Sequence, residues 1–255
     1  GFGLAVAAAG DMCVVGAPHW GCLRQGCDMG QAYLVSSDHA VDGAGAGWRL
    51  DEIACPEPEP ASEFGAAIAF DGATLVVASP RADAGANDSG AVDIYRVGPA
   101  PGRNVTHVVR LRAPHPQRSA HFGASVAVSG DWIAIGEPGF DGATANEGAV
   151  HMALRTSEGW RIQASLRAPA GAVGWYGASV ALAGVDLLIG APTARREHAP
   201  ESVPSARGSV VRAALLQGHW RATEVLCPGR ATEANGFGQA LALHAPWAIV
   251  RSEER

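Results

Sequence analysis

Two groups of residues in this 255-residue sequence have types and spacings that favour covalent chemistry: cysteines and the asparagines of glycosylation sequons. Cys22 and Cys27 are separated by four residues in one predicted loop, which is close enough for a local disulfide. A zinc site would need four ligands, and His19 is the only further candidate nearby. We therefore predict a Cys22–Cys27 disulfide and favour it over free thiols.

Two sequons for N-linked glycosylation begin at Asn87 (NDS) and Asn104 (NVT). The whole sequence contains four asparagines, so chance alone would give fewer sequons than two. Both asparagines fall in predicted loops, where a glycan has room. The pattern predicts glycosylation, passage through the secretory pathway, and an extracellular or cell-surface location.

Sequence motifs for catalysis are weak. The pentapeptide GASVA occurs twice and resembles the serine elbow of hydrolases, but it lacks the second glycine of that motif. Its serines, Ser125 and Ser179, fall at the same place in two copies of a repeat, which indicates a framework role. No HExxH pair of zinc ligands is present. From these observations we predict that the chain is not an enzyme and needs no cofactor.

Composition narrows the class of protein further. Apolar residues make up 47% of the chain and charged residues 17%, which is enough to form a buried core. The formal net charge of −6 disfavours a nucleic-acid partner, and no apolar run reaches the length of a membrane span. The 33 glycines and 16 prolines favour short strands with tight turns. Because the sequence starts without Met, we expect it to be part of a longer chain.

An aromatic-Gly pair recurs along the chain at intervals of 54 to 62 residues. A proline follows each of the first four pairs after a constant distance, so this segment is a rigid unit and the length differences lie in loops. The framework residues are Phe2, Gly3, Pro18, Phe64, Gly65, Pro80, Phe122, Gly123, Pro138, Tyr176, Gly177, Pro192, Phe237 and Gly238. The repeats span residues 1–63, 64–121, 122–175 and 176–236, with a partial fifth at 237–255.

Each repeat has the pattern of four short antiparallel strands. In FGASVAVSGDWIAIGEP, small and apolar residues alternate up to a tight turn at Gly130, and a second strand follows. A third strand starts after a variable loop, and a fourth starts near Trp48, Trp160 or Trp220. A four-stranded sheet cannot bury both faces alone, so the repeats predict an all-β fold in which blades stack around an axis as a β-propeller.

The segments FGASVAVSGDWIAIGEP and YGASVALAGVDLLIGAP resemble the FG-GAP repeat, and the integrin α-chain head is a more distant relative. The resemblance extends from Phe2 to about Val250. Copies two and three depart from the Gly-Ala-Pro signature with Ala78-Ser79-Pro80 and Gly136-Glu137-Pro138. Since propellers of this family usually have seven blades, we expect this chain to be a portion of a larger ring.

The resemblance also raises calcium binding, because integrin-type blades hold calcium in acidic hairpin loops. Here the corresponding turns are short and hold one acidic residue at most, whereas calcium takes six or more oxygens. Longer loops offer weak calcium candidates at Asp83, Asn87, Asp88 and Asp141.

The leading functional prediction is a non-enzymatic extracellular binding or adhesion module for a protein or glycan ligand. Variable loops around residues 19–29, 81–89, 139–147 and 193–207 would form the binding surface on a rigid scaffold. Trp20 and Trp175 could contact a ligand, but we expect a core position for both. Two alternatives stay open: a structural subunit of an extracellular assembly such as a cell wall or appendage, and an accessory domain of a secreted hydrolase.

Overall fold

The computed structural model describes residues 2–21, 29–38, 47–99, 104–194, 208–228, 235–244 and 246–253. Within these ranges the secondary structure consists of β-strands and turns. The strands form four antiparallel sheets of four strands and one hairpin. We number the four-stranded sheets as blades 1 to 4 in chain order.

Within each blade, strands that follow one another in sequence pair side by side. Blade 1 contains β1 (Val6–Ala9), β2 (Met12–Ala17), β3 (Gln31–Asp38) and β4 (Gly47–Ile53). Blade 2 contains β5 (Ala67–Phe70), β6 (Thr74–Ser79), β7 (Ala91–Val97) and β8 (Val105–Arg112). Blade 3 contains β9 (Ser125–Ser129), β10 (Trp132–Glu137), β11 (Ala149–Thr156) and β12 (Gly159–Arg167). Blade 4 contains β13 (Ser179–Ala183), β14 (Asp186–Ala191), β15 (Ser209–Leu216) and β16 (His219–Leu226). The hairpin contains β17 (Asn235–His244) and β18 (Trp247–Glu253).

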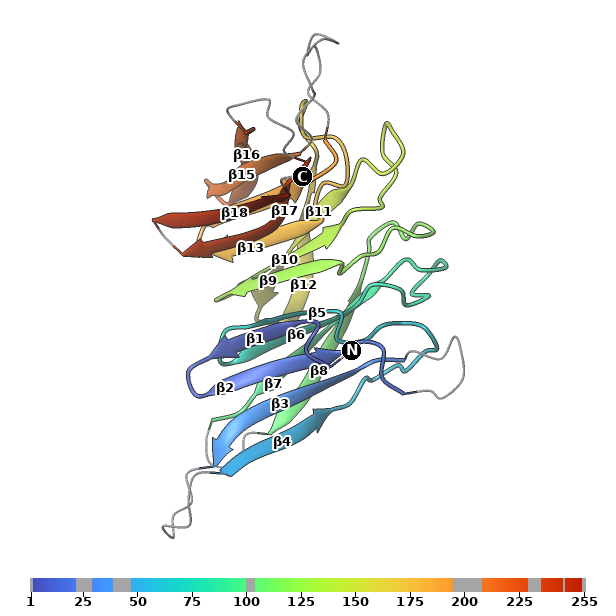
Figure 1. Cartoon of the computed structure of the whole chain (residues 1–255), viewed down its shortest axis with the longest axis vertical. Coiled ribbons are helices and arrows are strands. Elements are labelled where there is room, and N and C mark those ends of the chain that lie inside the picture. Colours follow the sequence, from blue (N-terminus) through green and yellow to red (C-terminus); the bar gives the residue numbers. More distant parts are fainter. Residues whose placement is uncertain are drawn as a thin grey trace.

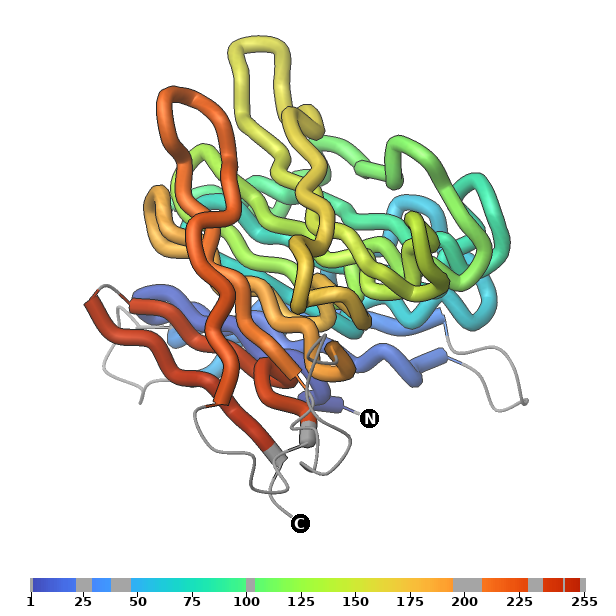
Figure 2. Tube along the Cα trace, turned by 90° about the horizontal axis from the view of Figure 1, so that it is seen from above, coloured from blue at the N-terminus to red at the C-terminus, as the bar shows by residue number. Residues whose placement is uncertain are grey.

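The first strands of successive sheets pack against one another, β1 on β5, β5 on β9, β9 on β13 and β13 on β17. Figure 1 shows the blades stacked in chain order, and Figure 2 shows the β11–β12 and β15–β16 hairpins projecting from this stack. This face-to-face arrangement of four-stranded antiparallel blades is that of a β-propeller. The prediction of an all-β propeller is therefore confirmed.

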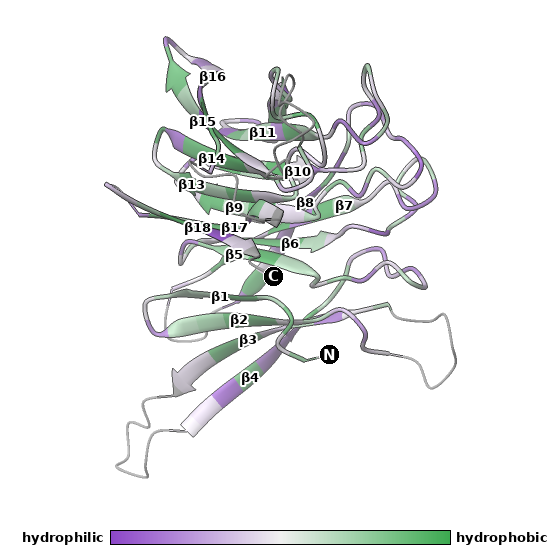
Figure 3. Cartoon of the chain, turned by 45° about the horizontal axis from the view of Figure 1, so that its top comes forward, coloured by the Kyte–Doolittle hydropathy of each residue, from purple (hydrophilic) through white to green (hydrophobic). Residues whose placement is uncertain are grey.

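Apolar side chains fill the spaces between successive blades. One cluster joins blades 1 and 2 and includes Phe64. A second joins blades 2 and 3 and includes Phe122, and a third joins blades 3 and 4 and includes Tyr176. Figure 3 shows this pattern as hydrophobic colour along strands such as β13 and β14, with hydrophilic colour common in the loops. Phe64, Phe122 and Tyr176 are therefore buried in the three inter-blade cores, whereas Phe2, the first of the recurring aromatic residues, is 64% exposed.

The glycines of the repeat bring the backbones of neighbouring blades together. A Cβ atom added to Gly136 would lie 2.0 Å from the carbonyl oxygen of Gly177 in the next blade. Gly190 has the same relation to Gly238. Ser125 Oγ donates a hydrogen bond of 2.8 Å to the same Gly177 carbonyl. The contact leaves no room for a side chain, which explains why glycine recurs at both positions.

Tyr176 differs from the phenylalanines at equivalent positions by one hydroxyl group. The residue is fully buried, and its hydroxyl oxygen has no hydrogen-bond partner within the described structure. Burial also raises the pKa of the Tyr176 hydroxyl. A buried polar group without a partner costs free energy, so we expect Tyr176→Phe to raise the free energy of unfolding by about 1 kcal/mol. Thermal and urea unfolding would measure this change.

Tyr95 provides the matched control for this prediction. It is also buried, but its hydroxyl donates a hydrogen bond of 2.8 Å to the carbonyl oxygen of Ala54. We expect Tyr95→Phe to lower the free energy of unfolding by about 1 kcal/mol, because this bond is lost. Equal destabilisation by Tyr176→Phe and Tyr95→Phe would contradict the interpretation.

Candidate functional site

Loops from successive blades lie along one side of the stack, on the right in Figure 1. We call this side the loop face and define it by the loops 81–89 and 139–147, the linkers 56–63, 114–121 and 169–175, and residues 18–21. The loops connect the second and third strands of a blade, and the linkers connect one blade to the next. Variable chain segments from neighbouring blades therefore meet on one surface.

The two fully described loops share one internal hydrogen bond. In the loop 81–89, Asp83 Oδ1 accepts a bond of 2.8 Å from the backbone N–H of Asp88. In the loop 139–147, Asp141 Oδ1 accepts a bond of the same length from the N–H of Asn146. Asp88 and Asn146 both have positive φ angles, 51° and 52°, which aspartate and asparagine tolerate better than most residues. The same local chemistry thus fixes the shape of both loops.

The linkers form hydrogen bonds to these loops. Glu59 Oε2 accepts a hydrogen bond of 2.9 Å from the N–H of Asp83. Gln117 bonds both backbone groups of Asp141, accepting from its N–H at 2.7 Å and donating to its carbonyl at 3.0 Å. The N–H of Ser119 donates to the carbonyl of Asn87, so one linker contacts the loops of two blades. The loop face is consequently a hydrogen-bonded surface in which the described loops have defined positions.

The weak calcium candidates lie in these loops, and the carboxylates of Asp83, Asp88 and Asp141 contact other groups of the protein. Asp83 and Asp141 accept the loop N–H groups described above, and Asp88 pairs with Arg81 at 3.2 Å. The structure places Asp83 and Asp88 in one loop and Asp141 in another. Over the residues that the structure describes, no group of three or more histidine, cysteine, aspartate or glutamate side chains could hold a metal ion.

Trp20 and Trp175 lie on the loop face with 57% and 50% of their surface exposed. The expectation of core positions for both is therefore wrong. The N–H of Trp175 bonds the carbonyl of Asn146 at the end of the loop 139–147, and the residue has a positive φ of 54°. This backbone position belongs to the linker and is also found at His121, one residue before the aromatic-Gly pair. The side chain of Trp175 is exposed, whereas that of the next residue, Tyr176, is buried in the core between blades 3 and 4.

The structure describes some of the residues that we predict to carry covalent modifications. Asn87 is exposed in the loop 81–89, and Asn104 is exposed immediately before β8. Cys22 and Cys27 lie outside the described residues, so their predicted disulfide stays a prediction. Among the described cysteines, Cys13, Cys55 and Cys227 are free thiols, the first two partly buried and the third exposed.

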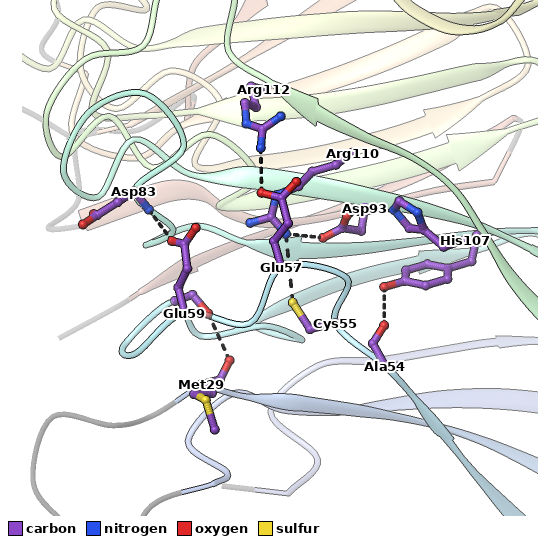
Figure 4. Close-up of polar contacts among 12 residues, drawn as sticks. Met29, Ala54, Cys55, Glu57, Glu59, Asp83, Asp93, His107, Arg110 and Arg112 are labelled. Atoms are coloured by element: carbon purple, nitrogen blue, oxygen red, sulfur yellow. Dashed lines mark hydrogen bonds and ion pairs between the residues drawn. The ribbon is translucent and has the colours of Figure 1, made fainter.

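A buried polar cluster lies between blades 1 and 2, behind the loop face (Figure 4). Asp93 on β7 forms an ion pair of 2.9 Å with Arg110 on β8, and their side chains are 0% and 4% exposed. His107 Nε2 lies 3.0 Å from the other Asp93 oxygen. Burial raises the pKa of Asp93, while the charges of Arg110 and His107 oppose that rise. Asp93 and Arg110 are thus buried, whereas the side chain of His107 is 33% exposed, and all three belong to one blade.

Glu57 extends the cluster to the linker between blades 1 and 2. Its Oε2 lies 2.6 Å from Arg112 and 3.5 Å from Arg110. The thiol of Cys55 lies 4.0 Å from Arg110, and burial raises its pKa. A thiol in this environment stays protonated and unreactive, so the cluster positions the linker and offers no nucleophile.

Sequence reasoning missed a second polar group, formed by Glu137, His151 and Ser165 on three adjacent strands of blade 3. One signal for it was present in the sequence. Glu137 stands where the Gly-Ala-Pro signature has alanine, and a charged residue in a predicted buried strand needs a partner. The partner itself could not be found without the pairing of the strands.

Among the described residues, no helix is long and apolar enough to cross a membrane. The FG-GAP repeat family model matches residues 105–152, from the start of β8 into β11. No curated protein sequence matches the chain.

Two solved structures illustrate the similarity of the fold. Trypanosoma rangeli sialidase in complex with the inhibitor DANA has 13% sequence identity and a TM-score of 0.48, with 87% of this chain and 38% of the sialidase covered. The periplasmic gluconolactonase of Pseudomonas aeruginosa has 16% identity and a TM-score of 0.40, with 88% of this chain and 72% of the lactonase covered. The chain thus spans well under half of the length of the sialidase.

The prediction that the chain is not an enzyme is corrected by these comparisons, because the solved structures that it is similar to are a sialidase and a gluconolactonase. The prediction rested on the absence of linear motifs. In stacked sheets, each strand contributes single residues to a shared surface, so a catalytic set can form from distant positions without any linear motif. A motif scan is therefore a poor test of catalysis in this fold.

Proposed function

Because this chain is an FG-GAP repeat protein, with a propeller of four-stranded blades, we propose that its loop face binds a protein or glycan ligand outside the cell. The observation that supports the proposal best is the exposure of Trp20 and Trp175 on a surface of hydrogen-bonded loops. Exposed tryptophans offer large apolar contact areas with an N–H donor, and they are enriched where proteins bind partners.

Rigid loops strengthen this proposal. A loop that is already ordered loses little conformational entropy when a ligand binds. The paired bonds of Asp83 and Asp141, together with those from Glu59 and Gln117, provide such order. Exposure of both sequon asparagines supports the proposed secretory route, since N-glycans are attached to exposed loops.

The proposal predicts that binding depends on Trp175. The wild-type chain, presented on a glycan array and on an array of secreted proteins, should bind members of one class. We expect Trp175→Ala to weaken that binding at least tenfold, because truncation of a central aromatic contact costs about 2 kcal/mol or more. Trp20→Ala should weaken it in the same direction. Surface plasmon resonance with the ligand found would give the affinities.

Trp48→Ala is the matched control. Trp48 is 75% exposed at the start of β4, which lies at the end of blade 1 away from the loop face. Its removal should leave affinity unchanged. Full affinity in a Trp20→Ala, Trp175→Ala double variant would contradict the proposal, and so would a lack of binding on both arrays.

A further inference from the structure

Three adjacent strands of blade 3 each place one polar side chain on the same face of the sheet. Glu137 ends β10, His151 lies on β11 and Ser165 lies on β12, and successive members are 14 residues apart in sequence. Ser165 Oγ lies 2.8 Å from His151 Nδ1, and His151 Nε2 lies 2.7 Å from Glu137 Oε2. These distances connect a hydroxyl, an imidazole and a carboxylate in one chain of hydrogen bonds.

The three groups differ sharply in exposure. The side chains of Glu137 and His151 are 1% and 3% exposed, whereas Ser165 is exposed on the outermost strand of the blade. The ring of Phe122 lies 5.3 Å from the imidazole ring and forms part of the apolar wall around it. The imidazole and carboxylate are thus shielded from water, whereas the third residue of this hydrogen-bond chain, Ser165, is at the surface.

A general base must be a neutral imidazole. When His151 is neutral and Glu137 is ionised, Nε2 donates to Glu137, because a carboxylate only accepts. That leaves Nδ1 as an acceptor, and the hydroxyl of Ser165 donates to it. In this state Nδ1 is poised to take the serine proton, and the Glu137 carboxylate holds the ring in position and stabilises the imidazolium that forms.

The repeat architecture does not require this set of residues. Blade 2 has the pair Asp93–Arg110 at the positions of His151 and Ser165, and blade 4 has Val211 and Val225 there. At the position of Glu137, blade 4 has Ala191. Apolar residues at these three positions are therefore compatible with the same blade structure.

A contribution to the stability of the fold does not explain the presence of Glu137, His151 and Ser165 either. The second oxygen of Glu137, Oε1, is buried and has no hydrogen-bond partner within the described structure. Burial of such a group costs free energy that apolar residues of similar size would avoid. Glu137, His151 and Ser165 therefore form a polar group that lowers stability, at positions where blade 4 has apolar residues. Such a group indicates a catalytic role.

We propose that Ser165 is a nucleophile for small carboxylic esters, with His151 as its general base and Glu137 as a positioning residue. Ser165 Oγ forms a bond to the ester carbonyl carbon while its proton moves to His151 Nδ1. The bond from that carbon to the alcohol oxygen then breaks, and the imidazolium gives its proton to the departing alkoxide, which leaves as the alcohol. A water molecule attacks the acyl-serine in the same way and releases a carboxylic acid and the free hydroxyl.

A basic residue lies on the same face of β12 as Ser165. Arg167 follows Ser165 by two residues on β12, so both side chains leave the strand on the same face. The guanidinium carbon of Arg167 sits 3.6 Å from the centre of the Phe140 ring, which holds the charge near the strand. This charge favours the oxyanion that forms when Ser165 attacks a carbonyl.

A fluorophosphonate probe tests the proposal, because it reacts with serines that have an adjacent base. We expect one probe adduct per chain, mapped to Ser165 by peptide mass spectrometry and lost in Ser165→Ala. We expect Glu137→Gln to slow labelling at least tenfold, since general-base assistance contributes about 10²- to 10⁴-fold. Hydrolysis of p-nitrophenyl acetate by the same variants gives a second readout and should fall in parallel.

Ser157→Ala is the matched control, because Ser157 is exposed in the turn that joins the same two strands. It should leave labelling and ester hydrolysis unchanged. Labelling of Ser165 no faster than that of Ser157 would overturn the proposal. Should Glu137→Gln fail to fold by circular dichroism, the comparison of Ser165→Ala with Ser157→Ala decides the outcome, because both serines are exposed.

Discussion

Substitution of Asp93 by alanine is expected to lower the free energy of unfolding by about 3–5 kcal/mol. The change leaves the guanidinium of Arg110, 4% exposed, without its closest partner at 2.9 Å, and its remaining ion pair is the longer one of 3.5 Å to the partly exposed Glu57. The cost is the desolvation of a buried charge that has lost its hydrogen-bonded carboxylate. For a chain of this size the midpoint of thermal unfolding should fall by roughly 6–20 °C, measured by circular dichroism.

Two controls separate this effect from the loss of any ion pair. Asp186 pairs with Arg212 at 2.7 Å, but both side chains are substantially exposed. Asp186→Ala should therefore cost less than about 1 kcal/mol. An Asp93→Leu, Arg110→Met double variant removes both charges and should recover most of the stability. A small cost for Asp93→Ala, similar to that of Asp186→Ala, would show that water reaches the buried pair.

Substitution of Gly136 by alanine is the second change with a large expected effect. The new Cβ would lie 2.0 Å from the Gly177 carbonyl oxygen and 2.4 Å from Ser125 Oγ. The same Gly177 carbonyl accepts the hydrogen bond of 2.8 Å from Ser125, so a shift of the two blades to make room would also disturb this bond. We expect a loss of about 3 kcal/mol, at the upper end of the usual cost of overpacking.

Gly47→Ala is the control for this prediction. Gly47 begins β4, has no positive φ and has open space around the position of an added Cβ. Alanine there should leave stability within about 0.5 kcal/mol of the wild type. Urea unfolding of both variants measures the difference, and equal stability of Gly136→Ala and Gly47→Ala would contradict the close approach of blades 3 and 4.

The fold was predictable because its determinants recur along the chain. The aromatic-Gly pairs and the prolines mark the same local structure several times, and each occurrence supports the others. A prediction that treats all copies alike fails where the surroundings differ. Trp160 and Trp220 are buried between blades, whereas Trp48 at the equivalent position is 75% exposed, because no described blade covers that face of blade 1.

The candidate sites were predictable only in part. The loops of the binding surface were found because their lengths vary between repeats. The exposure of Trp175 was missed because the residue adjoins a core aromatic residue, and only the backbone angle sends the two side chains in opposite directions. The set of Glu137, His151 and Ser165 was missed because partners on neighbouring strands are set by register, and a bulge in β11 and β12 shifts that register.

The contact between Gly136 and Gly177 has a consequence for how such chains can change during evolution. Both partners in it are main-chain groups, so the junction between two blades carries little side-chain information. Any two blades that have glycines at these two positions can form the same backbone contact with each other. Gene duplication, deletion or exchange of whole blades should therefore be tolerated where both glycines are present, whereas the joint between blades 2 and 3 carries alanine, Ala78, at the position of Gly136.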